Sequence, residues 1–430
     1  MVVEILNTGS ELMLGRVLNT HQQWLCAQLA DLGYVVSRQT AVPDTAAAIR
    51  AGVQEALGRA DLLIATGGLG PTSDDLTRDV LARFLERPLH EDPAILEQIT
   101  SFFTSRKRPM PASTRVQALV PEGALVLHNA FGTAPGLALE VPANRFRPGA
   151  ASSWLVMLPG PPRELRPMFT EQVVPLLRRV LPAAAKFVCH TWRTSGLGES
   201  MVEQTVAPAI EGLVARGLEL GYCARPGQVD VRLVARGDDA EVLVREAERI
   251  LQARLGAVLY GRESDEEEAV LIRRLTELKR TLALAESCTG GLLAHRLTNV
   301  PGASAVVLGG FVTYNNDIKQ KFLGVRPETL AEHGAVSEAV ARQMAEGARR
   351  VTGADVALAL TGIAGPSGGT DAKPVGTLFI ALAAASETVV EHHLNPYDRE
   401  TFKQVSTQQA MDLLRRRLGP ESPCTLKCAC

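Results

Sequence analysis

Two apolar runs, each followed by a glycine-rich turn and then by a helical pattern, most constrain the fold of this chain. Residues 61–66 form a short apolar run that meets Gly67-Gly68, and residues 281–285 lead through Ser287 into Gly290-Gly291. A buried strand that ends in glycine and gives way to a helix is the repeating unit of α/β domains. Ligands of such domains gather where strand C-termini meet helix N-termini. The sequence therefore predicts α/β architecture with candidate sites at both turns.

At 430 residues the chain exceeds one ordinary hydrophobic core and is expected to form several domains. Residues 1–172 alternate between strand and helix, which predicts a doubly wound sheet. Residues 173–260 place two strands on either side of Pro226-Gly227, which predicts a hairpin in a small α+β domain. Residues 261–419 alternate again. The tail 420–430 carries three thiols that could bind a soft metal, although no fourth ligand is evident: Cys424, Cys428 and Cys430.

Composition narrows the functional class. No apolar run approaches the roughly 20 residues that span a bilayer, and the N-terminal residues lack a basic region and a cleavage site. We therefore expect a cytoplasmic protein with no membrane partner. A formal net charge of -2 gives no global reason to bind nucleic acid. Four scattered cysteines fall in predicted helices or strands and are expected to be reduced, buried thiols: Cys26, Cys189, Cys223 and Cys288.

Ser287 is the best candidate for chemistry. At a helix start its hydroxyl would lie beside unpaired N–H groups and the positive end of the helix dipole, which favour a developing negative charge. The alternative is an ordinary N-cap. A catalytic serine needs a base, and Lys319 could serve if burial lowered its pKa, whereas an isolated Lys319 would be a solvated helix residue. Cys288 is the rival nucleophile.

Three further positions could converge on Ser287. Tyr314 lies at a predicted strand end, five residues before Lys319. Thr361-Gly362 ends another strand, where glycine would let the backbone approach a ligand. Arg399 opens the final helix.

The last domain resembles the nicotinamide mononucleotide deamidase family, also called PncC or the CinA C-terminal domain. Five sequence blocks carry the resemblance: AESCTGG at 285–291, GGFVTYNNDIK at 309–319, HGAVS at 333–337, TGIAGPSGG at 361–369 and KPVGT at 373–377. The resemblance implies an α/β sandwich that hydrolyses the carboxamide of nicotinamide mononucleotide to nicotinic acid mononucleotide and ammonia, with no cofactor.

Carried onto this chain, the resemblance makes Ser287 the nucleophile and Lys319 the general base, with Tyr314 nearby. The Gly290-Gly291 helix start and the Thr361-Gly362 turn would bind the oxyanion or the substrate phosphate. Arg399 would contact the phosphate. The family usually has arginine one helical turn later, where this chain has Lys403, which keeps the charge but loses bidentate geometry.

The first domain has its own candidate site. Its glycines could admit a phosphate to the backbone, while Asp74 and Asp75 at a predicted helix start could hold a divalent cation that bridges to it. The alternative is a capped helix after a tight turn. The candidate substrate-binding residues here are Glu11, Gly67, Gly68, Gly70, Thr72 and Asn129.

This domain resembles the CinA N-terminal domain, related to molybdopterin-binding proteins. The blocks that carry the resemblance are GSEL at 9–12, GGLGPTSDD at 67–75, NAFGTAPG at 129–136 and LPGPPREL at 158–165. Some family members hydrolyse ADP-ribose to AMP and ribose 5-phosphate with a divalent metal such as magnesium and with potassium. His21 stands where the family usually has another residue, which weakens the pyrophosphatase inference.

The middle domain resembles the KH-like linker domain of CinA proteins. Its loop from Gly196 to Glu199 lacks the basic clamp of an RNA-binding KH loop, so we expect a spacer or dimerisation element in a homodimer, with no nucleic-acid partner.

The main hypothesis is an enzyme of pyridine nucleotide recycling, which acts on nicotinamide mononucleotide and also on ADP-ribose. One alternative is a nucleotide- or pterin-binding regulatory protein linked to competence, with one or both sites inactive. In a third hypothesis, only the first domain is catalytic.

Overall fold

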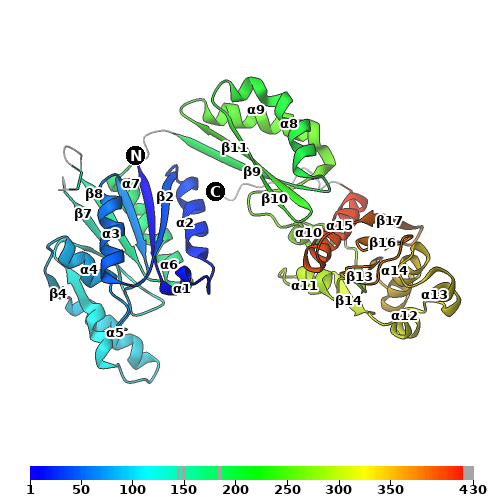
Figure 1. The fold of residues 1–430 in the computed structure, drawn as a ribbon, viewed down its shortest axis with the longest axis horizontal. Coiled ribbons are helices and arrows are strands. Elements are labelled where there is room, and N and C mark those ends of the chain that lie inside the picture. Colours follow the sequence, from blue (N-terminus) through cyan, green and yellow to red (C-terminus); the bar gives the residue numbers. More distant parts are fainter. Residues whose placement is uncertain (143–145, 148–151, 183–185, 420–430) are drawn as a thin grey trace. The chain divides into compact units, whose positions relative to one another are not determined.

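The computed structural model describes residues 1–142, 146–147, 152–182 and 186–419. The chain divides into two units, Met1–Val188 and Cys189–Cys430 (Figure 1). The tail cysteines lie outside the described residues, so the predicted soft-metal site is not placed.

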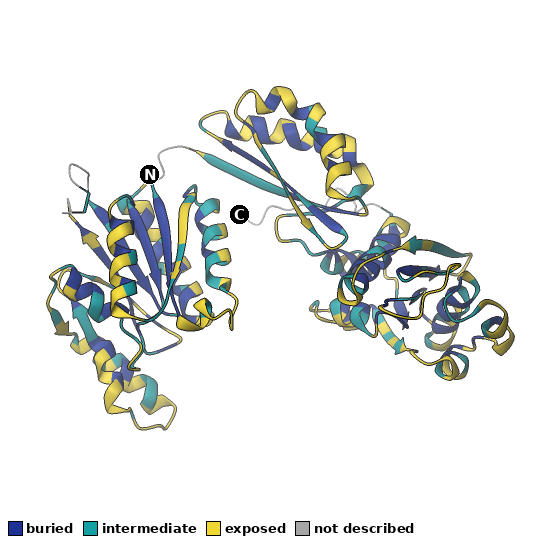
Figure 2. Cartoon of the chain, viewed as in Figure 1, coloured by how far each residue is buried: buried dark blue, intermediate teal, exposed yellow. Residues whose placement is uncertain are grey.

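The first unit is a six-stranded α/β sheet. Its strand order is β2 (Val36–Val42), β1 (Val3–Thr8), β3 (Leu62–Thr66), β8 (Ser153–Leu158), β7 (Gly136–Val141) and β6 (Leu125–Leu127). The first four strands are parallel, and β7 is antiparallel to both of its neighbours. Every residue of β1 and β3 is buried, as expected of interior strands with helices on both faces of the sheet (Figure 2).

Helices cover both faces of this sheet. One face packs against α2 (Thr20–Asp31), α6 (Pro162–Met168) and α7 (Val174–Val180). The other packs against α3 (Ala46–Leu57) and α4 (Thr77–Phe84). Outside these layers lie α1 (Ser10–Met13), α5 (Pro93–Ser105), β4 (Leu89–Glu91) and β5 (Leu119–Pro121). The doubly wound architecture predicted from the alternating pattern is confirmed.

Two boundaries predicted in the first unit lie elsewhere in the structure. The helix expected from Asp74 begins at Thr77 instead. The reason is local: the carboxylate of Asp75 accepts a hydrogen bond from the backbone N–H of Thr72 at 2.9 Å, which closes a turn ahead of the helix. The expected domain boundary after residue 172 also precedes α7, whose Leu176 and Leu177 are buried in the first unit's core.

The second unit begins with a small α+β domain. Its sheet has the order β10 (Glu219–Arg225), β11 (Gln228–Arg236), β9 (Phe187–Ser195) and β12 (Leu259–Arg262). Helices α8 (Glu199–Val214) and α9 (Ala240–Leu255) accompany it. The predicted hairpin forms, since Arg225 pairs with Gln228 and Gly227 supplies a φ of +76° at the turn.

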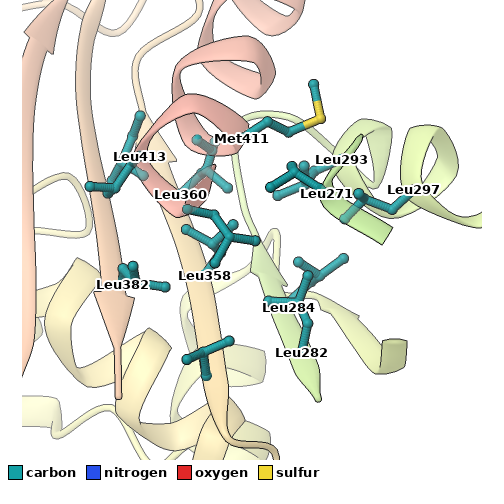
Figure 3. Close-up of a cluster of buried hydrophobic side chains, with 14 of the residues drawn as sticks. Leu271, Leu282, Leu284, Leu293, Leu297, Leu358, Leu360, Leu382, Met411 and Leu413 are labelled. Carbon is teal, nitrogen blue, oxygen red and sulfur yellow. The ribbon is translucent and has the colours of Figure 1, made fainter. Parts of the chain in front are cut away.

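A second α/β domain completes this unit. Its sheet has the order β14 (Val307–Val312), β13 (Leu282–Glu286), β15 (Val356–Gly362), β16 (Thr377–Ala383) and β17 (Thr388–Leu394). β14, β13 and β15 are parallel, and the last two strands are antiparallel. One face packs leucines of the sheet against α10 (Glu267–Glu277), α11 (Leu292–Thr298) and α15 (Arg399–Leu418) (Figure 3). The other face carries α12 (Asn316–Leu323), α13 (Pro327–His333) and α14 (Glu338–Thr352).

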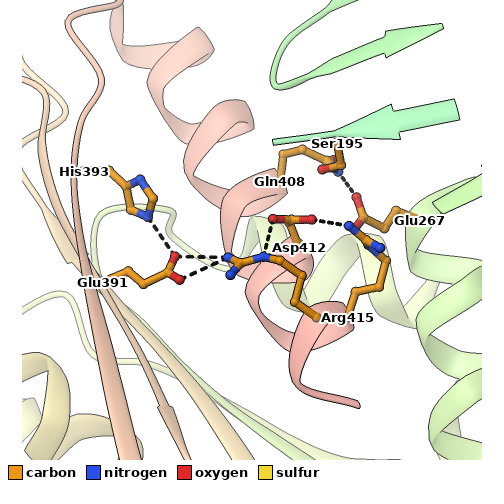
Figure 4. Close-up of polar contacts among 8 residues, drawn as sticks. Ser195, Glu267, Glu391, His393, Gln408, Asp412 and Arg415 are labelled. Atoms are coloured by element: carbon orange, nitrogen blue, oxygen red, sulfur yellow. Dashed lines mark hydrogen bonds and ion pairs between the residues drawn. The ribbon is translucent and has the colours of Figure 1, made fainter. Parts of the chain in front are cut away.

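Helix α15 joins the two domains of this unit. Its Gln408 is buried and donates to the Ser195 hydroxyl of the small domain at 3.2 Å (Figure 4). The side chain of Gln408 accepts from Arg296 of α11 at 3.1 Å. Gln408 also contacts the carboxylate of Glu267. Burial raises the pKa of Glu267 to about 7, although the guanidinium of Arg415 opposes the shift. The small domain is therefore packed directly onto the helix whose first residue is Arg399.

Candidate active site

The end of β13 places Ser287 at the centre of the sheet edge. Parallel strands β14 and β15 flank β13, so their carboxyl ends meet there. Ser287 donates its backbone N–H to Leu360 of β15 at 3.0 Å. Thr313, which follows β14, donates its own N–H to the carbonyl of Glu286 at 2.8 Å. Three strand ends therefore hold the nucleophile candidate from both sides.

Lys319 reaches Ser287 from α12. Asn315 caps this helix by accepting from the N–H of Asp317 at 2.7 Å, and the first turn carries Lys319 inward. The lysine is 1% exposed, and its Nζ lies 3.1 Å from Ser287 Oγ. The alternative of a solvated Lys319 is therefore wrong.

The surroundings of Lys319 suit a neutral amine. Desolvation by burial lowers the pKa of Lys319. Its Nζ donates to the carbonyl oxygens of Thr313 at 2.8 Å and Tyr314 at 3.5 Å. An amine that donates to these two carbonyls has its lone pair available to accept the Ser287 proton, which is the task of a general base.

Cys288 is poorly suited to compete as nucleophile. Its side chain is buried, and burial raises the pKa of the thiol to about 12. The thiolate is the reactive form, so this thiol is inert near neutral pH. Cys223, by contrast, is exposed, and the prediction that it is buried is wrong.

The helix start beyond Ser287 differs from the prediction. Gly290 and Gly291 take left-handed φ values of +64° and +95°, which make the turn. The carboxylate of Glu286 accepts from the backbone N–H groups of Gly291 at 3.0 Å, Leu293 at 3.2 Å and Ala294 at 2.8 Å. Three of the N–H groups expected to be unpaired at this helix start are therefore already bonded within the chain.

Thr361 and Gly362 support the site by packing. The Thr361 hydroxyl is buried and donates to the carbonyl of Ala335 at 2.8 Å. A Cβ at Gly362 would lie 2.7 Å from the carbonyl oxygen of Thr377 and 3.3 Å from Cys288 Sγ. The close approach of these residues of the same chain, rather than of a ligand, accounts for a glycine at this position.

Cationic and phenolic groups lie near the exposed start of α15, which we call the mouth of the site. Arg399 donates to the carbonyl of Gly365 at 2.9 Å and to the hydroxyl of Tyr314 at 2.6 Å. Tyr314 is 61% exposed. Lys403, one helical turn further along α15, places its Nζ 3.8 Å from the position that a Cβ on Gly290 would take. The structure thus places Lys403 close to the turn after Ser287 and holds Arg399 against Tyr314.

The first unit holds a separate cavity of about 400 Å³ at the carboxyl ends of its strands. Six of the predicted residues line it: Glu11, Gly67, Gly68, Gly70, Asp74 and Asp75. Within the described residues, Thr72 and Asn129 do not line it. Asn129 is buried and donates to the carboxylate of Glu164 at 2.8 Å.

Glu164 and Gln117 also line this cavity and were missed from the sequence. Glu164 stands in the first turn of α6, directly after a proline-rich strand exit. The position of Glu164 at a helix start after a strand end could have identified it from the sequence. No such signal marked Gln117, because it lies in a short 3-10 helix, Ala112–Ala118, far along the chain from the glycine turn.

The predicted metal pair is not a preformed centre. Asp74 is exposed, and the carboxylate of Asp75 is bonded to the backbone and hydroxyl of Thr72. Over the ranges that the structure describes, no group of three or more His, Cys, Asp or Glu side chains is arranged to hold a metal ion. A divalent ion at this turn would therefore depend on Asp74 and Asp75 together with the phosphate oxygens of a bound nucleotide.

The family follows from whole-chain comparison. Residues 264–418 match the CinA C-terminal domain, residues 190–261 the damage-inducible protein CinA KH domain, and residues 4–179 the probable molybdopterin binding domain. A putative competence-damage inducible protein of Moorella thermoacetica is 42% identical over 421 residues, which cover 97% of this chain and 99% of that protein. The chain belongs to the CinA family.

Other CinA relatives agree. A CinA-like protein of Akkermansia muciniphila is 43% identical over 412 residues, 95% of each chain. The crystal structure of the competence/damage inducible protein CihA from Agrobacterium tumefaciens is 43% identical, covers 36% of this chain and 98% of that one, and gives a TM-score of 0.34. The family and the three-part CinA architecture predicted from the sequence are confirmed. Among the described helices, none combines the length and apolarity needed to cross a membrane.

Proposed function

We propose that the C-terminal domain is a serine amidase that hydrolyses the carboxamide of nicotinamide mononucleotide. The observation that carries the proposal is the 3.1 Å approach of Lys319 Nζ to Ser287 Oγ. A lysine buried beside a serine, with its pKa lowered by desolvation, is a base for activating that serine. A protein that only bound nucleotides would need neither group in this arrangement.

The reaction follows from these two groups. Ser287 Oγ attacks the carboxamide carbon while its proton passes to Lys319 Nζ, which gives a tetrahedral oxyanion. The C–N bond then breaks, and Lys319 returns the proton to the departing nitrogen, so ammonia leaves and an ester remains on Ser287. A water molecule gives a proton to Lys319 and attacks the ester. The Ser287 oxygen departs and regains that proton, releasing the carboxylic acid, which then loses its own proton to ammonia or water to give the carboxylate product.

Arg399 and Lys403 would hold the nucleotide phosphate at the mouth of this site. Both are cations near the exposed end of α15, and the phosphate carries up to two negative charges. Arg399 is already oriented by Gly365 and Tyr314, so its guanidinium loses little further freedom when it binds. Lys403 contributes charge without bidentate geometry.

For the first domain we propose binding of a nucleotide such as ADP-ribose in the 400 Å³ cavity. A volume of this size is typical of small-molecule sites. Asp74 and Asp75 line this cavity and would hold a divalent ion, which would supply positive charge to the diphosphate.

Ammonia release from nicotinamide mononucleotide tests the proposal. The full chain is expected to release ammonia without added metal, and Ser287→Ala to lose that activity while it still binds the nucleotide. Folded protein that binds the nucleotide but releases no ammonia would favour the regulatory alternative. AMP formation from ADP-ribose that needs magnesium and disappears in Asp75→Ala would instead make the first domain catalytic.

A further inference from the structure

The buried carboxylate of Glu286, which immediately precedes Ser287, has no role in the reaction above. We propose that Glu286 is a positioning residue that holds both the nucleophile and its base by occupying the start of α11. The proposal rests on the proposed amidase function and extends it to a residue that does not touch the substrate.

The Glu286 side chain holds the start of α11 through hydrogen bonds. Its side chain is 1% exposed and accepts from three backbone N–H groups of the Gly290-Gly291 turn and the first turn of α11. N–H groups at a helix start lack partners within the helix, and bonds to a carboxylate are stronger than bonds to a neutral acceptor. A carboxylate buried among these donors fixes the path of the chain from residue 286 to residue 294.

Two hydrogen bonds also connect the backbone of Glu286 to Lys319 through Thr313. The backbone carbonyl of Glu286 accepts from the N–H of Thr313, and the carbonyl of Thr313 accepts from Lys319 Nζ, each at 2.8 Å. Ser287 is covalently attached to Glu286. One residue therefore fixes the nucleophile through the chain and the base through Thr313.

This arrangement also affects where the substrate can bind. The Glu286 carboxylate uses the donors that would otherwise attract an anion, and it adds a negative charge there. A substrate phosphate is consequently directed towards Arg399 and Lys403 at the mouth.

The test compares two variants with a matched control in the full chain. Glu286→Gln keeps the shape but loses the charge and one acceptor oxygen, and Glu286→Asp keeps the charge but shortens the reach. The control is Glu268→Gln, which removes a salt bridge to Arg296 of the same helix at 2.7 Å without touching its first turn. A residue that merely stabilised α11 would behave like this control.

Two readouts separate this proposal from the choice of substrate. The first is the rate at which a fluorophosphonate probe labels Ser287, which requires no nucleotide. The second is the division between kcat and KM for ammonia release. Loss of charge-assisted hydrogen bonds predicts that Glu286→Gln lowers the labelling rate and kcat by about 10- to 150-fold, with KM little changed. Glu268→Gln should stay close to the unmodified chain in both.

Normal labelling in the unmodified chain without ammonia release would refute the nucleotide substrate, and the labelling comparison would still decide the role of Glu286. Labelling as fast in a folded Glu286→Gln or Glu286→Asp chain as in the unmodified one would overturn the proposal. Failure of both variants to fold would make Glu286 a determinant of the fold and would also overturn it, as would an unlabelled Ser287 in the unmodified chain.

Discussion

The packing of the small domain on α15 can be measured with two glycines of the same domain. Gly227 has a φ of +76° and Gly237 a φ of +90°, so alanine at either position carries a similar backbone cost of about 1–2 kcal/mol. Their surroundings differ. A Cβ at Gly227 would lie 2.9 Å from Cγ and 3.1 Å from Cβ of Gln408, whereas a Cβ at Gly237 would meet nothing within 4 Å.

The difference between the two variants therefore isolates the contact with Gln408. Forcing a methyl group into a packed interface costs about 1–3 kcal/mol. We expect Gly227→Ala to lose that much more local stability than Gly237→Ala, which corresponds to hydrogen exchange about 5- to 150-fold faster.

Hydrogen exchange of the full chain, followed by mass spectrometry, is the appropriate assay because it reports each segment separately. The additional loss should appear in β10 and β11 and in the segment of α15 around Gln408, and it should spare the first unit. Equal effects of the two substitutions on these segments would refute the reasoning, since the backbone cost alone would then account for both.

Three further predictions concern the second α/β domain. Lys319→Met should reduce ammonia release by about 100- to 10,000-fold in steady-state assays, because it removes the general base. Since the folded pKa of Lys319 lies below its unfolded value of 10.5, the unfolded chain binds this proton more tightly, so Lys319 destabilises the fold fully below its folded pKa and loses this effect as the pH rises to 10.5. The methionine variant should accordingly gain stability in urea unfolding at pH 7, and this gain should shrink as the pH approaches 10.5. Cys288→Ala should retain most of the activity, because the thiol does not attack; loss as complete as in Ser287→Ala would contradict this. Leu358→Ala, at a fully buried position of β15, should destabilise this domain by about 2–5 kcal/mol in thermal or urea unfolding.

The sequence supported the elements that depend on local pattern. The buried strand before Ser287 and the hairpin at Pro226-Gly227 both form as expected. Each has a short-range cause: an uninterrupted apolar run in the first case and a turn glycine between strands in the second.

Contacts made by side chains with a choice of partners were not predictable from pattern. Nothing in the spacing says that the Glu286 carboxylate turns back onto α11, or that Asp75 bonds Thr72 instead of starting a helix. Both outcomes depend on a competition among nearby acceptors for the same backbone donors. The burial of Gln408 likewise depends on a domain that lies far away in the sequence.

Mass spectrometry of the peptide that contains Ser287, after rapid acid quenching during turnover of nicotinamide mononucleotide, tests most directly whether Ser287 is the nucleophile. We expect a transient ester on Ser287, with the mass of the acyl nucleotide, that appears before the carboxylate product and is absent from Ser287→Ala. Ammonia release that continues undiminished in Ser287→Ala, or an adduct found on Cys288 instead, would contradict it.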